Sequence, residues 1–195
     1  MSRTKEFDIN KTLYETMLLF WEKGYSNTSL ALIMKATKLN KQSIYDTFGD
    51  KYEFFLKALQ MYREKTLNSI EAAIKKDLQS GNSTLAILAK MISPLGQQEG
   101  FPKGCLIINT SLEFNKEYIH VFQEVNKMFE GFEEHLSYVV QIGQERGEIT
   151  KKFSLEEITK ILANAFKGLK VAERMGDSVS SIEQVVNITI DMIRL

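Results

Sequence analysis

The chain has 195 residues, of which 44% are hydrophobic and 26% are charged. These values are ordinary for a globular protein, and the length fits one or two domains with a sizeable core. The 25 basic and 25 acidic residues give a net charge of zero, which argues against a protein that coats nucleic acid by bulk electrostatics.

The sequence pattern predicts neither a membrane-spanning helix nor a secretory signal. No apolar run approaches the ~20 residues of a membrane-spanning helix, and the opening stretch MSRTKEFDINK lacks the apolar core of a secretory signal. We therefore expect a cytoplasmic protein that does not associate with a membrane. Helical periodicity persists almost from end to end, and prolines occur only at Pro94 and Pro102. The pattern predicts an all-α fold of about nine helices.

The first predicted helix has an inner face formed by Ile9, Leu13, Met17 and Phe20, and Gly24 ends it as a C-terminal glycine cap. Residues 28–51, TSLALIMKATKLNKQSIYDTFGDK, then predict two short helices joined by a tight turn. We expect the first helix to pack beneath this pair.

Capping residues and apolar spacing define the two short helices. Thr28 or Asn27 can cap the first, and Asn40 can cap the second. Ile44 and Phe48 lie four residues apart and are expected to face inward. Four polar side chains are left to point outward, where they can reach phosphates or base edges of DNA: Lys41, Gln42, Ser43 and Thr47. This layout is typical of a helix-turn-helix DNA reader, although any pair of short surface helices also has a polar outer face.

The charge of this first segment is mildly positive. Residues 1–51 contain eight basic and six acidic side chains, so they carry +2 and the remainder of the chain −2. A small reading head that touches few phosphates is consistent with this bias, whereas a non-specific binder would have a far larger excess.

A long helix is predicted from about Asp50 to Gln79, before the breaking sequence Ser80-Gly81-Asn82-Ser83. It would link the head to a helical body. The body pattern predicts five more helices with loops at 96–100 and 147–154: Thr84–Leu95, Lys103–Phe114, Tyr118–Glu145, Leu155–Met175 and Ile182–Arg194.

The segment from Phe20 to Tyr25, FWEKGY, with Thr28 and Ser29, and the segment from Ser43 to Lys51, SIYDTFGDK, resemble the N-terminal domain of TetR-family bacterial regulators. The resemblance covers roughly the first quarter of the chain. It implies a DNA-binding domain over 1–51 and an effector-binding and dimerisation domain over 52–195. The function implied is that of a ligand-responsive repressor, which a small effector releases from a palindromic double-stranded operator.

The same resemblance assigns roles to residues of the head. It places Thr28 and Ser29 at the start of the first reading-motif helix, and Lys41, Gln42, Ser43, Tyr45 and Thr47 on the second. Tyr45 and Lys51 would hold phosphates, whereas Lys41 and Gln42 can present donors to base edges. Relatives usually have a glycine where this chain has Lys38, so the lysine must adopt a positive φ or force a different turn, and it can add a phosphate contact.

The body is rich in aromatic residues and methionine, and these side chains can simply fill a core. The resemblance adds an effector pocket between the linking helix and the central helices. Few charges occur among the candidates, so we expect a largely apolar or aromatic effector. The candidate lining residues are Tyr62, Met91, Cys105, Asn109, Phe129 and Phe166.

The single cysteine, Cys105, lies in a segment that, with Glu113, resembles a subgroup with a Gly-Cys-Leu start to the sixth helix. Some members of that subgroup sense electrophiles or oxidants through such a cysteine. A place in the first turn of a helix, with Lys103 nearby, would favour the thiolate. The alternative is an inert, buried thiol that packs as a small hydrophobe.

The last two predicted helices have apolar stripes. They carry Ile158, Ile161, Leu162, Ala165, Phe166, Leu169 and Ala172 on one helix and Ile182, Val185, Val186, Ile190 and Ile193 on the other. They can form a lid on the core. The resemblance implies instead a four-helix homodimer interface, in which Ala163, Ala165 and Gly168 permit close approach. A two-fold dimer would set its reading helices ~34–36 Å apart.

An enzyme is the rival class, and no catalytic constellation supports it. His120 and His135 lie too far apart for a chelating pair, and Cys105 is the only thiol, so no metal site is expected. A Cys105–His120 nucleophile pair is conceivable, but a lone histidine on a charged helix is usually a surface residue. No cofactor is expected either. A second rival is a helical adaptor whose helix-turn-helix serves protein contacts.

Overall fold

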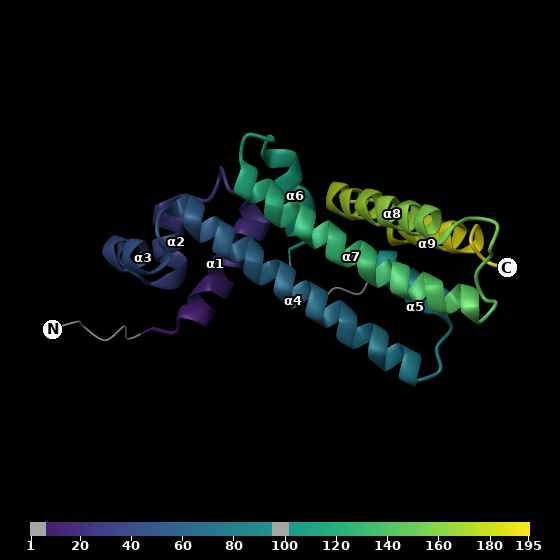
Figure 1. The fold of residues 1–195 in the computed structure, drawn as a ribbon. Coiled ribbons are helices and arrows are strands. Elements are labelled where there is room, and N and C mark those ends of the chain that lie inside the picture. The colour runs from purple at the N-terminus through teal and green to yellow at the C-terminus, as the bar shows by residue number, and fades with distance from the viewer. Residues whose placement is uncertain (1–6, 95–101) are drawn as a thin grey trace.

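The computed structural model describes residues 7–94 and 102–195 (Figure 1). Within these ranges the chain forms nine α-helices and one isolated antiparallel bridge between Ile149 and Arg194. The all-α prediction is confirmed. Among the described helices, none combines the length and the apolar character that crossing a membrane requires.

Three helices form the head at one end of the molecule: α1 (Ile9–Lys23), α2 (Leu30–Thr37) and α3 (Lys41–Phe48) (Figure 1). Gly24 ends α1 as predicted, with a φ of 79° and its N–H donating to the Phe20 carbonyl. Met17 and Phe20 are buried, but Ile9 is 42% exposed, so its predicted place on the inner face is wrong. Ile9 is the first residue of α1, where the helix end has fewer neighbours.

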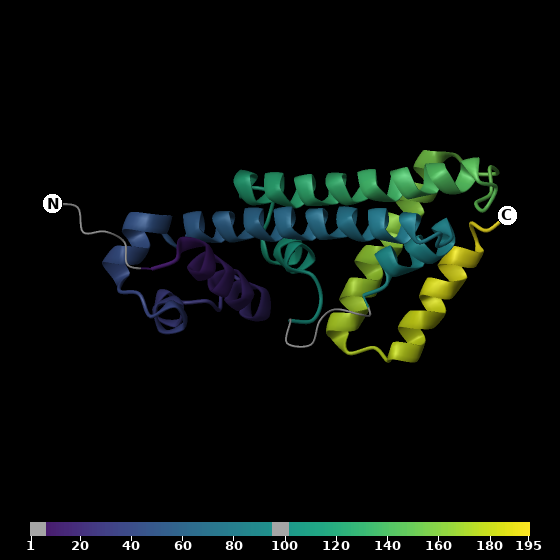
Figure 2. The same cartoon turned by 90° about the horizontal axis from the view of Figure 1, so that it is seen from below.

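The linking helix α4 (Lys51–Gln79) begins at a capping box, in which Asp50 and Glu53 satisfy each other's backbone N–H groups. Its 29 residues span about 43 Å at a rise of 1.5 Å per residue. Figures 1 and 2 show α4 leaving the head and running beside α7 (Ile119–Glu145) along the body.

The other body helices are α5 (Thr84–Ile92), α6 (Leu106–Glu113), α8 (Leu155–Met175) and α9 (Val179–Asp191). The bounds predicted for α8 are confirmed. α5 ends at Ile92 and not at the predicted Leu95, because Ser93, which precedes Pro94, has an extended backbone. The loop predicted at 96–100 lies outside the described residues. α9 begins and ends three residues earlier than predicted, because Ser178 supplies its N-cap.

The start of α6 also differs from the prediction. It begins at Leu106 and not at Lys103, because Gly104 has a φ of 83° and Cys105 an extended backbone. Cys105 is therefore the N-cap residue and not a member of the first turn.

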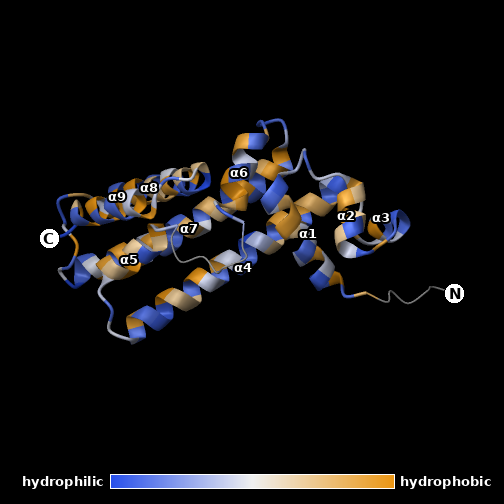
Figure 3. Cartoon of the chain, turned by 180° about the vertical axis from the view of Figure 1, so that it is seen from behind, coloured by the Kyte–Doolittle hydropathy of each residue, from blue (hydrophilic) through white to orange (hydrophobic). Residues whose placement is uncertain are grey.

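The core extends from the head into the body without interruption. Figure 3 shows hydrophobic and hydrophilic residues alternating along the helices, as amphipathic packing requires. The most extensive contacts between helices are those of α1 with α4, α4 with α7, and α7 with α8. Helix α4 thus contacts both the head and the body.

Candidate nucleic-acid interface and effector region

The turn between α2 and α3 is set by Lys38. This residue adopts the left-handed conformation, with φ 59° and ψ 18°, and is the one non-glycine residue with positive φ in the described part of the chain. A left-handed L-residue costs about 1–2 kcal/mol. The sequence left open whether Lys38 adopts a positive φ or forces a different turn, and the structure shows the positive φ. The Lys38 side chain is exposed.

The start of α2 differs from the prediction. Ser29 is the N-cap, and its hydroxyl accepts a hydrogen bond from the Leu32 N–H at 3.2 Å. Thr28 is fully buried and its hydroxyl donates to the Gly24 carbonyl at 2.6 Å. Neither Thr28 nor Asn27 caps α2. Burial also prevents Thr28 from contacting DNA directly, so its part in the head is structural.

Helix α3 is held by its inner face. The Asn40 side chain accepts from the Ser43 N–H at 2.8 Å, which confirms the predicted cap. Ile44 and Phe48 are buried as predicted. The Phe48 ring stacks on Phe54 of α4 at 4.0 Å. This contact fixes α3 against the linking helix.

The outer face of α3 carries Lys41, Gln42 and Tyr45, all exposed, with Ser43 half-buried. The Gln42 amide donates to Asp46 at 2.8 Å, so a base contact would have to replace that bond. The Lys41 ammonium lies 5.6 Å from the centre of the Tyr45 ring. Thr47 is different, because its hydroxyl is covered and has no hydrogen-bond partner. The residue is half-buried, and the hydroxyl that was expected to face DNA is not exposed.

Lys51, expected at a phosphate, lies at the start of α4 with its ammonium 4.1 Å from the centre of the Tyr25 ring. Burial lowers the pKa of Lys51, and the negative charge of Glu113 partly opposes that shift. The ammonium thus lies over the Tyr25 ring and feels the negative charge of Glu113.

Glu113 joins α6 to the head, a role that the sequence did not predict. Its two carboxylate oxygens accept hydrogen bonds from the backbone N–H groups of Tyr25 at 2.9 Å and Ser26 at 2.6 Å. Burial alone would raise the pKa of Glu113. Hydrogen bonding from the Ser26 side chain, the two backbone bonds and the charge of Lys51 outweigh this effect and leave the pKa lowered. One signal was available, since a helix C-terminus normally disfavours an acidic residue.

Two of the effector candidates are in direct contact. The Tyr62 hydroxyl donates to the sulfur of Cys105 at 3.4 Å, and both residues are buried. Burial, followed by the interaction with Cys105, raises the pKa of Tyr62 well above its usual value. Asn109 lies one turn into α6, and its side-chain N–H₂ group is covered without a hydrogen-bond partner. These three residues surround the start of α6.

The remaining effector candidates lie in different settings. Phe166 packs against Phe132, with ring centres 4.4 Å apart. Phe129 is half-buried beneath the ammonium of Lys167, 4.5 Å from its ring centre, and Met91 is half-buried at the edge of the core. Five of the six candidates, all but Asn109, belong to the hydrophobic core or pack against it.

A buried charge pair lies beside Cys105, and the sequence analysis missed it. Lys170 of α8 is only 6% exposed, and its ammonium is 3.4 Å from the Glu173 carboxylate. The same carboxylate accepts from the Gly104 N–H at 3.2 Å. Burial lowers the pKa of Lys170, against the opposing effects of Glu173 and Cys105. The surroundings of Cys105 are thus more polar than the largely apolar site expected from the sequence.

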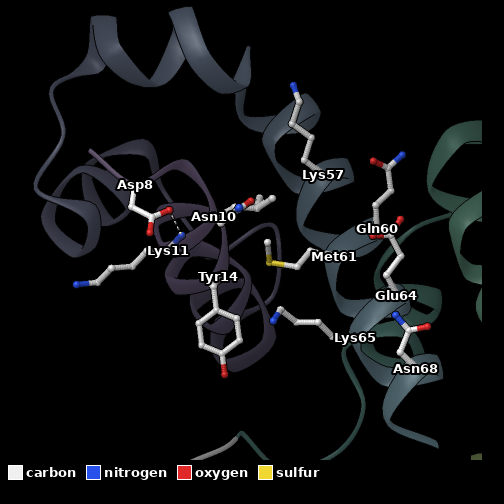
Figure 4. A pocket seen from close by; sticks show the side chains of 11 residues that line it. Asp8, Asn10, Lys11, Tyr14, Lys57, Gln60, Met61, Glu64, Lys65 and Asn68 are labelled. Carbon is white, nitrogen blue, oxygen red and sulfur yellow. Dashed lines mark hydrogen bonds between the residues drawn. The ribbon is translucent and has the colours of Figure 1, made fainter. Parts of the chain in front are cut away.

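Two surface grooves accompany these features. One, of about 690 Å³, lies between α1 and α4, where Figure 4 shows Tyr14 on one side and Met61 and Lys65 on the other. The second, of about 290 Å³, is lined by residues of α5 and α9 together with Ser93. None of the six effector candidates lines either groove.

Helices α8 and α9 have two apolar faces each. The inner faces are buried in the chain's own core, as shown by Ile158, Leu162 and Ile190. The outer faces expose Ile161, Val185 and Ile188. At Gly168 an added Cβ would meet open space beyond the backbone of its own helix. Ala163 is buried, so its predicted part in close helix approach is wrong. The inner faces therefore cover the chain's own core, and the outer faces leave apolar side chains exposed on the same helices.

Comparison with known proteins places both parts of the chain. The family described as "Bacterial regulatory proteins, tetR family" matches residues 13–58, and "Tetracyclin repressor-like, C-terminal domain" matches residues 81–189, more than half of the chain. The HTH-type transcriptional repressor ComR of Escherichia coli (strain K12) is 26% identical, over 96% of this chain and 90% of its own length.

Solved structures share the fold. A TetR-family transcriptional regulator from Cytophaga hutchinsonii superposes with a TM-score of 0.82 at 20% identity, covering 95% of this chain and 94% of that one. A cysteine mutant of the TetR-family regulator CifR, complexed with 26bp double-strand operator DNA, has a TM-score of 0.75 at 22% identity, covering 98% and 100%.

Proposed function

The chain belongs to the TetR family of bacterial regulatory proteins, and from that premise we propose that it is a homodimeric repressor that binds operator DNA through α2 and α3. Regulation of transcription, and not catalysis, is the activity of this family. The observation that carries the proposal is the exposed polar face of α3, set on the buried pair Ile44 and Phe48. We place the protein in the cytoplasm, with its DNA.

We assign different roles to the exposed residues of the head. Lys41 and Gln42 read base edges, since both project from the outer face of α3. Ser29, Lys38, Ser43, Tyr45 and Lys51 contact phosphates, and Thr28 and Thr47 support the helices from inside. The DNA-binding domain comprises residues 1–51, and residues 52–195 form the effector-binding and dimerisation domain.

The dimer forms through the outer faces of α8 and α9. Their exposed apolar side chains continue across Ile161, Val185, Ile188 and Met192, a composition that favours burial against a second copy. A two-fold axis would make the interface self-complementary and the operator an imperfect palindrome.

The effector site lies between the linking helix α4 and the central helices α5 to α8, and its candidate lining residues are Tyr62, Met91, Cys105, Asn109, Phe129 and Phe166. A small, largely apolar or aromatic molecule would bind there and favour a geometry of the two heads that no longer fits adjacent grooves. Such a molecule shifts the equilibrium only if it binds that geometry more tightly than the DNA-bound one. The unpartnered amide of Asn109 offers one hydrogen bond to a polar group on it.

A thiol-based sensor is the second candidate function, and the contact between Cys105 and Tyr62 favours it. Modification of the sulfur would break a bond between α4 and α6. Burial of the thiol opposes it, because reaction requires access. A helical adaptor without specific DNA binding is the remaining alternative.

Fluorescence anisotropy with DNA fragments from the neighbourhood of its own gene tests the proposal. Wild-type protein should bind one fragment specifically. Gln42→Ala should reduce the difference in affinity between fragments that differ at one base pair. Tyr45→Phe should lower the affinity for all fragments by the same factor. Lys75→Ala, on an exposed part of α4 far along the body, is the matched control. Binding that is equal for every fragment and indifferent to the α3 variants would favour the adaptor.

A further inference from the structure

We infer that Glu113 is a positioning residue for DNA binding, and that it holds the head to the body through the backbone of the α1–α2 turn. The inference rests on the proposed function. It adds to the linking helix α4 a second connection between the two domains, made by the last residue of α6.

The contact is a two-pronged hydrogen bond to consecutive backbone groups. The carboxylate accepts from the Tyr25 N–H through Oε2 and from the Ser26 N–H through Oε1. Bonds to an ionised acceptor are stronger than neutral ones, and two of them fix direction as well as distance. Since Ser26 and Tyr25 belong to the turn that leads into α2, the bond constrains the reading motif directly.

The turn is shaped around this carboxylate. Gly24 has a φ of 79°, and a Cβ there would lie 3.0 Å from Glu113 Oε2. Beneath the turn, the Tyr25 ring lies 5.0 Å from Phe55 of α4 and 5.1 Å from Phe114, the residue after Glu113. The ring packing supports the hydrogen bonds from their apolar side, although Glu113 itself is solvent-exposed on the other.

Three elements meet at this point. Lys51, at the start of α4, lies over Tyr25, and its charge interacts with that of Glu113. At the opposite end of α6, the sulfur of Cys105 accepts a hydrogen bond from the Tyr62 hydroxyl. Helix α6 has eight residues, about 12 Å at 1.5 Å per residue, so it joins the proposed effector region to the head as one short rigid segment.

The test compares Glu113→Ala and Glu113→Gln with Glu117→Gln in the full-length protein. Glu117 is a matched control because it is exposed and its side chain bonds only to nearby Asn115. Amide hydrogen exchange by NMR should show protection of Ser26 and Tyr25 falling tenfold or more in Glu113→Ala. It should fall less in Glu113→Gln, which keeps one acceptor, and should not change in Glu117→Gln.

A second measurement reports the head's orientation without DNA. Spin labels on non-natural residues at Lys35 and Gln141, in dimers diluted with unlabelled protein, give the head-to-body distance by electron double resonance. We expect the distribution to broaden in Glu113→Ala only. Unchanged protection or an unchanged distribution would overturn the inference.

Operator affinity completes the test. Glu113→Ala should weaken binding about tenfold with an unchanged salt dependence, because no phosphate contact is lost. A broadened distribution with full affinity would show that the bond is structural and would overturn its role in DNA binding. Failure of the wild type to bind any fragment, with broadening still seen, would instead refute the proposed repressor function.

Discussion

The hydroxyl of Tyr62 on α4 donates a hydrogen bond to the sulfur of Cys105, 3.4 Å away at the N-cap of α6. This bond joins the helix that carries the head to the helix whose far end touches the head through Glu113. A displacement of either residue can therefore be transmitted to α2 and α3 through two helices, α4 and α6.

Replacement of the cysteine separates the two interpretations of Cys105. Cys105→Ser should leave DNA binding intact, because the hydroxyl is close in size to the thiol and can accept from Tyr62. If Cys105 is a sensor, wild-type protein should release DNA on treatment with an alkylating agent, and the variant should not. Fluorescence anisotropy of labelled operator DNA measures binding by each protein before and after the treatment. A variant that still releases DNA would exclude sensing by this thiol, and a wild type that is insensitive would leave Cys105 as inert packing.

The strained turn at Lys38 should respond to glycine. Lys38→Gly removes the cost of the left-handed conformation, which the greater freedom of glycine in the unfolded chain partly offsets. We expect a gain of about 0.5–1 kcal/mol in the free energy of unfolding by urea titration. Lys38→Ala keeps the strain and removes only the charge, so it should change stability little. Weaker DNA binding by both variants would identify the charge as the phosphate contact.

Acid should release the Glu113 bond. Because its folded pKa lies below the ordinary value of 4.5, the carboxylate contributes stability that is fully present above that value. The contribution is lost as the pH falls through the lowered folded pKa. The neighbouring charge that faces it, Lys51, stays protonated throughout this range. Urea titrations of wild type and Glu113→Gln should therefore converge in acid and differ at neutral pH. A difference that is independent of pH would contradict the assignment.

The proposed interface should be sensitive to charge. Ile188 is 55% exposed on the outer face of α9, so Ile188→Glu should keep the monomer folded but bury an unpaired carboxylate in the dimer. Sedimentation velocity at micromolar concentration should show a dimer for wild type and a monomer for the variant. Leu112→Glu, at a 75% exposed site on α6, is the control and should remain dimeric. A monomeric wild type would refute this interface.

The sequence by itself determined the helices, several of their caps and the inner face of α3. Ile44 and Phe48 were predicted inside and Asn40 as a cap, and the structure confirms all three. Such features depend on residues within about four positions of one another, since that is the reach of a helical turn or a capping side chain. The family resemblance also came from local motifs of the head.

The sequence was a weaker guide to which of two neighbouring residues caps a helix or faces solvent. Ser29, not Thr28, caps α2, because Thr28 is drawn inside by its bond to Gly24. Thr47 likewise had the spacing of an outward residue, yet its hydroxyl is covered. The helical period gives only the approximate direction of a side chain, and the packing of the neighbouring elements decides whether that direction is open to solvent.

Only the tertiary structure decided the long-range contacts. Glu113 meets Tyr25 and Ser26 across 88 and 87 residues of sequence. The burial of Lys170 beside Glu173 and Gly104 likewise depends on α8 meeting the start of α6. Lys170 and Glu173 have ordinary i,i+3 helical spacing, but the burial of the pair arises only where the shared core brings α8 against the start of α6. The spacing within one helix does not predict such contacts between helices. The parts of the head were thus predictable, and its attachment to the body was not.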